Sequence, residues 1–106
     1  MLIQEIDENK KRYLHLLLLA DEQEDMVDRY LERGTMYVLD DNGVKAECIV
    51  TDEGNGVLEI KNIATLPDYQ KQGYARKLID FLVAKYSEQY SCLLYTSPSP
   101  RDTERS

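Results

Sequence analysis

Residues 63–78 decide how this chain folds, and they read Ile63-Ala64-Thr65-Leu66-Pro67-Asp68-Tyr69-Gln70-Lys71-Gln72-Gly73-Tyr74-Ala75-Arg76-Lys77-Leu78. An apolar run that is typical of a strand ends near Leu66, and Pro67 and Asp68 predict a turn directly after it. A loop with a glycine then leads into an amphipathic helix. This order predicts an anion-binding site, because the first N–H groups of a helix have no backbone acceptor. Gly73 lets a ligand approach the bare backbone.

The spacing Gln70-x-x-Gly73-x-Ala75, after a strand that ends Asn62-Ile63-Ala64-Thr65, resembles the acetyl-CoA signature of the GNAT N-acetyltransferases. The family consensus is Arg/Gln-x-x-Gly-x-Gly/Ala, and its backbone amides hold the pyrophosphate of CoA. The resemblance is sharpest over residues 58–86. The alternative is an ordinary strand–turn–helix connection that happens to use glycine.

The resemblance also implies the fold class. We expect an α/β (α+β layered) domain with the GNAT-like acyl-CoA N-acyltransferase fold, in the order β-α-α-β-β-β-α and incomplete at the C-terminus. A chain of 106 residues is one domain at most. A complete GNAT domain usually runs longer, and the part beyond usually carries the second wall of the pantetheine cleft and a tyrosine that protonates the departing thiolate. No residue of this chain can be named as that acid.

Acetyl-CoA is the co-substrate that the resemblance implies, with no metal. Two groups of residues would hold it. The first binds the pyrophosphate and comprises Gln70, Lys71, Gln72, Gly73, Tyr74, Ala75 and Arg76. The second lies on the preceding strand, pairs with pantetheine and supplies the N–H donor for the oxyanion, and it comprises Ile63, Ala64 and Thr65. Arg76 and Lys77 place two cations at a helix start, where acids are usual unless a phosphate binds there.

Glu59 is the candidate base. It lies fourteen residues before Gly73 and eleven before Gln70, which matches the spacing of a glutamate base in the histone-acetyltransferase branch of the family. The implied reaction is direct attack of an amine on the acetyl thioester. Most such amines are protonated at neutral pH, so a base must take a proton directly or through water. A solvent-facing glutamate on an amphipathic strand is the alternative.

Two other hypotheses stay open. One is a small non-catalytic module that binds CoA, a nucleotide or a protein through the helix start at Gly73. The other concerns this polypeptide alone: a truncated acetyltransferase is expected to be inactive, because truncation exposes a sheet edge and half a core.

The net charge of −7 is unevenly distributed. Residues 1–60 contain 15 acidic and 6 basic residues, whereas residues 61–106 contain 5 and 7. Such an acidic chain argues against nucleic-acid binding, which needs a basic surface. It suits a cationic acceptor, either a small-molecule amine or a protein amine. Asp25, Asp28 and Glu32 are candidates for selecting that cation, although a solvated acidic helix face is the simpler reading.

Cys48 and Cys92 indicate neither a disulfide framework nor a metal site, and Cys48 is expected to be inert packing. No signal peptide is apparent, and the leucine run at residues 16–19 is too short to span a membrane. We therefore expect a cytoplasmic protein without a membrane partner.

In the first third of the chain, residues 1–6 predict a strand and residues 9–19 a helix with a core face at Leu14, Leu17 and Leu18. His15 on that helix has no acidic or nucleophilic partner nearby in sequence and is expected to be structural or exposed. Asp21 and Glu24 have the spacing of a capping box. The helix that they open is expected to end at Arg33-Gly34 and to bury Met26, Val27, Tyr30 and Leu31.

Further along, residues 35–39 and 44–51 predict strands joined by the turn Asp41-Asn42-Gly43. A second turn at residues 52–56 leads to a strand over residues 57–65. After Gly73, a helix facing a sheet is predicted from its apolar positions 75, 78, 79, 82, 83 and 86.

The end of the chain differs in composition. Residues 92–102 resemble the translation of a transposase adapter used in preparing sequencing libraries, so we expect residues 1–91 to be a partial GNAT domain and residues 92–106 a non-native tail. A natural Ser/Pro-rich tail is the alternative. Residues 91–96 are nonetheless apolar and compatible with a strand.

Overall fold

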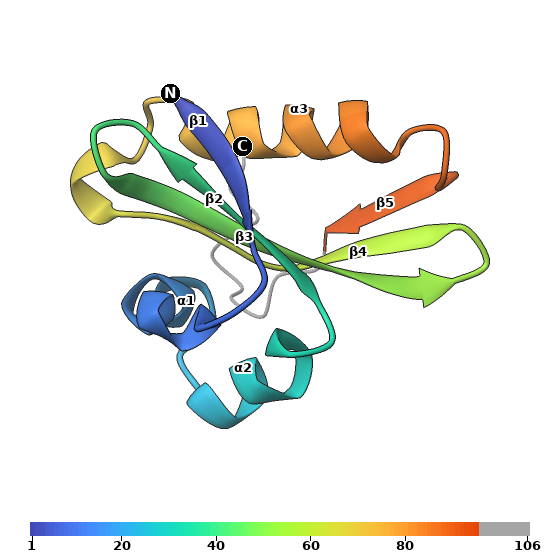
Figure 1. Ribbon diagram of the computed structural model, residues 1–106, viewed down its shortest axis with the longest axis horizontal. Coiled ribbons are helices and arrows are strands. Elements are labelled where there is room, and N and C mark those ends of the chain that lie inside the picture. Colours follow the sequence, from blue (N-terminus) through green and yellow to red (C-terminus); the bar gives the residue numbers. More distant parts are fainter. Residues whose placement is uncertain (96–106) are drawn as a thin grey trace.

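The computed structural model describes residues 1–95 of the chain as a five-stranded sheet with helices on both faces (Figure 1). The strands follow one another in chain order across the sheet, and they are β1 (Leu2–Ile6), β2 (Thr35–Asp40), β3 (Val44–Gly54), β4 (Val57–Thr65) and β5 (Cys92–Tyr95). Neighbouring strands from β1 to β4 are antiparallel, whereas β5 runs parallel to β4.

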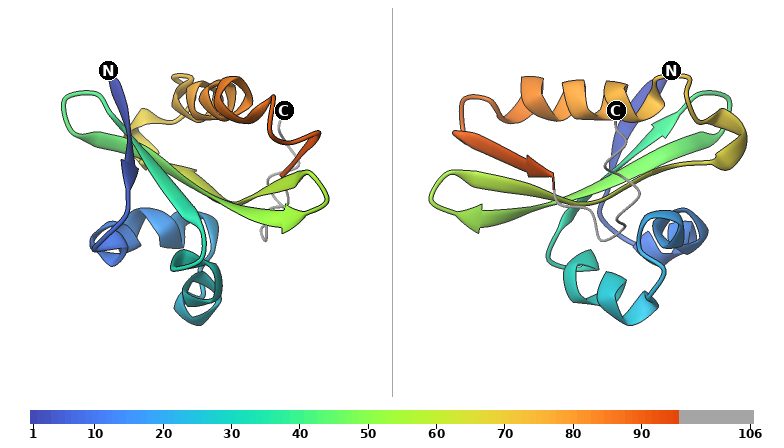
Figure 2. Two further views of the ribbon diagram at one scale, coloured as in Figure 1. Left: turned by 45° about the vertical axis from the view of Figure 1, so that its right-hand side comes forward. Right: turned by 180° about the vertical axis from the view of Figure 1, so that it is seen from behind.

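Helices cover the two faces unequally. One face carries the 3-10 turn η1 (Lys10–Tyr13), α1 (Leu14–Ala20) and α2 (Glu24–Leu31), and the other carries α3 (Tyr74–Tyr86) (Figures 1 and 2). The short 3-10 turn η2 (Pro67–Tyr69) links β4 to α3. Helix α3 crosses from the end of β4 to the start of β5, which is the connection that two parallel strands require. The predicted layered α/β fold and its element order are confirmed.

Each face of the sheet has its own core. The core between α3 and the sheet includes Tyr37, Cys48, Leu78 and Leu82. The core between the sheet and helices α1 and α2 includes Val27 and other apolar side chains. Cys48 is fully buried and free, as predicted, and burial raises the pKa of its thiol. Because both faces of β3 are covered, its side chains are buried on both sides instead of alternating.

The predicted strands are close to the observed ones. β4 has the expected bounds, and β2 and β3 run one and three residues further than predicted. Asn42 and Gly43 have φ of 59° and 110°, the positive values that a tight hairpin turn needs. The second turn is narrower than predicted, since β3 continues to Gly54 and only Asn55 and Gly56 form the turn.

The capping-box prediction is wrong. Helix α2 begins at Glu24 after Gln23, and no side chain caps it. The carboxylate of Asp21 is buried, where it accepts a hydrogen bond from the Tyr30 hydroxyl at 3.2 Å. A buried carboxylate needs donors to offset its lost hydration, and the nearby hydroxyl meets that need better than a helix start does.

Three other predictions need correction. The first helix is split into η1 and α1, because the tight first turn directs Lys10 inward. The Lys10 ammonium donates to the carbonyls of Leu31 and Gly34 at 2.7 and 2.8 Å, so it caps the C-terminal end of α2. Met26 and Val83 are exposed, each lying at the border of its helix's apolar face, whereas Leu16 and Phe81 pack inward.

The fifth strand lies within residues 92–106, which the sequence predicts to be a non-native tail. Residues 92–95 pair with β4 over Val57–Ile60. Residues 96–106 lie outside the described part, so the boundary between residues 91 and 92 stays a prediction.

Candidate functional site

The loop between η2 and α3 has an unusual backbone. Lys71 and Gly73 both adopt left-handed conformations, with φ of 67° and 87°. Glycine takes this conformation readily, but lysine does so only where its surroundings enforce it. Gly73 occupies the N-cap position of α3, no side chain caps this helix end, and an added Cβ at Gly73 would meet nothing within 4 Å. The space in front of the helix start is therefore open.

The N–H groups of this loop lack backbone acceptors among residues 1–95. The first hydrogen bond of α3 runs from the Lys77 N–H to the Gly73 carbonyl at 2.9 Å, so within those residues the N–H groups of residues 74–76 have no backbone partner. In the part of the chain that the structure describes, the N–H groups of residues 71–73 also reach no backbone acceptor with ordinary hydrogen-bond geometry. The loop and helix start thus present a series of donors at the positive end of the helix dipole, an arrangement that binds phosphate oxygens.

The charges near the helix start favour an anion. The first turn of α3 contains no acidic residue. Lys71, Arg76 and Lys77 are exposed there, and only Arg76 has an ion pair among the described residues, with Asp80 at 3.5 Å. An exposed pair of this kind is weak and readily exchanged. A phosphate group could therefore draw Arg76 away from Asp80, and Lys71 and Lys77 have no ion pair to give up among residues 1–95.

The strand before the loop has an unpaired edge. β5 pairs with β4 only as far as Ile60, so within residues 1–95 the outer side of residues 61–65 has no neighbouring strand. A register shift against β3 makes Lys61 an extra residue between Ile60 and Asn62. The Gln70 side-chain amide donates to the Thr65 carbonyl at 3.2 Å, which ties the loop to the end of this edge. The structure therefore brings residues 63–65 and 70–76 together as one continuous surface.

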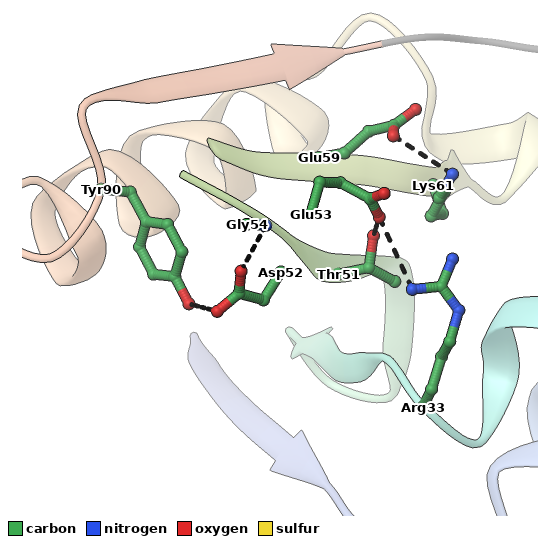
Figure 3. Close-up of polar contacts among 8 residues, drawn as sticks. All are labelled: Arg33, Thr51, Asp52, Glu53, Gly54, Glu59, Lys61 and Tyr90. Carbon is green, nitrogen blue, oxygen red and sulfur yellow. Dashed lines mark hydrogen bonds and ion pairs between the residues drawn. The ribbon is translucent and has the colours of Figure 1, made fainter. Parts of the chain in front are cut away.

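Glu59 lies further back on β4, beside other charged groups (Figure 3). Its carboxylate forms an ion pair with the Lys61 ammonium at 3.1 Å, and only 15% of the Glu59 side chain is exposed. The neighbouring Glu53 lies 3.6 Å from the guanidinium of Arg33. A hydrogen bond donated by Thr51, together with the charge of Lys61, lowers the pKa of Glu53. The Lys61 ammonium thus lies against the carboxylate of Glu59, the candidate base.

The positions of Glu59 and the loop suit an extended ligand. Strand residues rise about 3.3 Å each, so Glu59 lies roughly 10–13 Å along β4 from Ile63, with the loop further on. A ligand with its phosphates at the helix start and an arm along the β4 edge would reach towards Glu59.

The acidic residues of α2 do not join this surface. Asp25 and Glu32 are exposed, and Asp28 pairs with Lys11 at 2.7 Å. These positions are compatible with a solvated helix face, and a role in selecting a cationic acceptor stays a prediction. His15 is exposed on α1, in agreement with the prediction.

Tyr74 has a role that the sequence did not reveal. Its side chain is buried, and its hydroxyl donates to the Asp41 carboxylate in the β2–β3 turn at 2.6 Å. Asp41 is recognisable in the sequence only as a turn residue, because no local pattern indicates a contact with a residue 33 positions away.

A cavity of about 250 Å³ lies at the other end of α3, between that helix and β5. Most of its lining is apolar, including Leu58, Leu82 and Leu93. It is therefore distinct from the surface formed by Gly73 and its neighbours.

Within residues 1–95, no group of three or more His, Cys, Asp or Glu side chains is placed to hold a metal ion. No helix among those residues is long and apolar enough to cross a membrane.

The chain matches known acetyltransferases in sequence. A sequence model of the family described as "Acetyltransferase (GNAT) domain" matches residues 32–104. The uncharacterized N-acetyltransferase YvbK of Bacillus subtilis (strain 168) is 34% identical over 74 residues. That alignment covers 69% of this chain and 48% of YvbK, so the chain spans about half the length of this relative.

Solved structures give the same result. A GNAT family acetyltransferase from Elizabethkingia anophelis, with acetyl-CoA bound, superposes with a TM-score of 0.84 at 27% identity over 96% of this chain and 69% of the other. An acetyltransferase from Bacillus subtilis in complex with CoA has a TM-score of 0.73 at 31% identity over 81% of this chain and 57% of the other. The predicted resemblance is thereby confirmed, and the chain belongs to the GNAT family of N-acetyltransferases.

Proposed function

We propose that the protein transfers an acetyl group from acetyl-CoA to an amine, which is either a small molecule or an amine of a protein. The observation that carries the proposal is the series of N–H groups over residues 71–76 that have no backbone acceptor among residues 1–95, next to the edge of β4 that β5 leaves unpaired. The relatives from E. anophelis and B. subtilis that hold acetyl-CoA and CoA support it.

In this proposal the loop of residues 70–76 binds the pyrophosphate, with the cations of Lys71 and Arg76 adding charge. The pantetheine arm adds to the edge of β4 as an extra strand would, because the backbone groups on that side of residues 63–65 are free of β5. An N–H of this strand would donate to the oxyanion of the tetrahedral intermediate.

The chemical step then needs an unprotonated amine. The amine nitrogen attacks the thioester carbonyl carbon, the C–S bond breaks, and CoA leaves as its thiolate. Glu59 receives the proton of the amine directly or through water. The Lys61 ammonium that pairs with Glu59 is the group that a cationic acceptor would displace.

Isothermal titration of the chain with acetyl-CoA tests the binding part. Gly73→Asp is expected to weaken binding more than tenfold, because a carboxylate would replace open space in front of the helix start and repel the phosphates.

Gly54→Asp is the matched control. Gly54 has nearly the same φ (88°) and equally open space, but it lies in the β3–β4 turn. Equal affinities of the two variants would contradict the phosphate site. Tight binding without turnover of any amine in the protein encoded by the whole gene would leave a non-catalytic binding module.

A further inference from the structure

The β2–β3 turn contacts the loop before α3 at both of its ends (Figures 1 and 2). On one side, the Leu66 N–H donates to the Lys45 carbonyl at 2.9 Å, and the Lys45 ammonium lies 4.5 Å from the centre of the Tyr69 ring. On the other side, the Tyr74 hydroxyl donates to Asp41 at 2.6 Å. The β2–β3 turn and the start of β3 therefore hold Leu66 and Tyr69, which precede the proposed phosphate-binding segment of residues 70–76, and also Tyr74, which lies within it.

The turn is itself well fixed. The Asp40 carboxylate accepts from the Gly43 N–H at 3.0 Å, and the Asp41 N–H donates to the Gly43 carbonyl at 2.9 Å. The Lys45 ammonium adds a hydrogen bond to the Asn42 carbonyl at 2.9 Å. Asp40 pairs with Val44, so the turn has only three residues, and two of them, Asn42 and Gly43, take positive φ angles. A turn this short leaves little freedom for Asp41.

The loop needs such an anchor. Residues 70–73 are exposed, and a left-handed lysine is strained unless surrounding contacts enforce it. Within residues 1–95, the only side-chain hydrogen bond that residues 70–73 make is the one from Gln70 to the Thr65 carbonyl. A buried side chain directly after Gly73 is well placed to fix the conformation of the loop, and Tyr74 is such a side chain.

The chemistry of the contact fits an anchor. A hydroxyl that donates to a carboxylate at 2.6 Å makes one of the shorter and stronger hydrogen bonds in proteins. The hydrogen bond to Asp41 also raises the pKa of Tyr74, so the hydroxyl keeps its proton and stays a donor at neutral pH. The ring of Tyr69 lies beside that of Tyr74, with centroids 6.5 Å apart.

We propose that Asp41 is a positioning residue for CoA, which acts through the Tyr74 hydroxyl to hold the phosphate-binding loop in its donor-presenting conformation. The inference rests on the proposed CoA site. Asp41 itself touches no part of the ligand in this account. Loss of the Tyr74–Asp41 hydrogen bond should therefore weaken binding of the phosphates. Binding of the pantetheine arm, which would lie along β4, should be unchanged.

The test compares Tyr74→Phe and Asp41→Asn with the unchanged chain, by calorimetry with CoA and with pantetheine, which lacks the pyrophosphate. Tyr74→Phe is expected to lower the affinity for CoA about tenfold and to leave the affinity for pantetheine unchanged. The tenfold loss corresponds to part of what a hydrogen bond to a charged group contributes. Asp41→Asn keeps an acceptor oxygen for the Tyr74 hydroxyl, so it is expected to lose less CoA affinity than Tyr74→Phe. Because Asp41 is only partly buried, this second variant keeps the test informative if Tyr74→Phe folds poorly.

Tyr90→Phe is the matched control. The Tyr90 hydroxyl donates to the Asp52 carboxylate at 2.9 Å, beyond the other end of α3 (Figure 3). This variant removes the same kind of hydrogen bond away from the loop, and its CoA affinity should match that of the unchanged chain.

Two results would overturn the positioning role while leaving the CoA site standing: equal CoA affinities of Tyr74→Phe and Tyr90→Phe, or a parallel loss of CoA and pantetheine. An unchanged chain that binds no CoA would instead remove the proposed function, and the positioning role with it.

Discussion

Glu59 is the residue on which the proposed chemistry depends most directly. If it accepts the proton of the amine, Glu59→Gln should lower kcat about 100-fold or more and leave the KM for acetyl-CoA unchanged, since base catalysis contributes about that much. The measurement is steady-state kinetics of the protein encoded by the whole gene, with a panel of amines.

The control for this prediction is Glu53→Gln, which alters a neighbouring carboxylate that already has Thr51 and Arg33 as partners. If both variants retain full kcat, a water chain or another residue acts as the base.

Glu47 on β3 is fully buried, and neither of its carboxylate oxygens has a hydrogen-bond partner within the described residues. Burial raises the pKa of Glu47 well above its usual value. We predict that Glu47→Met, which replaces the buried carboxyl with an apolar side chain of similar size, stabilises the fold by about 1–3 kcal/mol at pH 7. Urea unfolding measures the difference.

The pH dependence of this effect has a definite sign. A raised folded-state pKa stabilises the fold fully below the unfolded value near 4.5, and that stabilisation is lost as pH rises through the folded pKa. Relative to Glu47→Gln, the unchanged protein should therefore lose stability from about pH 4.5 upwards. Tyr30 and Cys48, which interact with the Glu47 charge, have raised pKa values and stay neutral over this range. A constant difference between pH 4 and 8 would contradict the buried, protonated carboxyl.

The sequence predicted the roles of some residues and not of others. Gly73 was identifiable because a local motif surrounds it. Glu47 and Lys10 were not, because their burial depends on helices that cover the sheet from distant parts of the chain. Glu47 lies on β3, and α1 and α2 cover one face of that strand while α3 covers the other.

At the scale of elements, the connection from α2 to β2 leaves little room at Gly34. A Cβ at Gly34 would lie 2.7 Å from Ile49 Cγ2 and 2.8 Å from the Tyr30 carbonyl oxygen. We predict that Gly34→Ala destabilises the fold by about 1–3 kcal/mol through overpacking. Thermal unfolding measures this, and a variant as stable as the unchanged chain would show that α2 can shift away from the sheet.

Strands were predicted more accurately than helices for a physical reason. The turn at Asn42-Gly43 and the one at Asn55-Gly56 fix where β3 and β4 begin, because only residues that accept positive φ occupy them. The helices of the first third have no comparable signal. Their bounds depend on the inward-directed Lys10 and Asp21, which are long-range contacts.

For the whole molecule, the open point is the last strand. We propose that residues 92–106 are not native, since residues 92–102 resemble a translated adapter. Independent sequencing of the source gene should diverge directly after the codon for Ser91 and continue into a strand, a helix and a final hairpin. A gene that encodes the printed sequence through Ser106 would contradict this and make β5 a native strand.

An open strand edge is also a template on which another polypeptide can add. Within residues 1–95, residues 61–65 of β4 offer such an edge, with the apolar Ile63 and Ala64 along it. Under the proposed function, the pantetheine amides would occupy the same backbone groups that a second molecule would use for intermolecular pairing. Under this proposal, co-substrate occupancy and resistance to aggregation are coupled, and we expect the apo form to self-associate more readily than the CoA-bound form when concentrated.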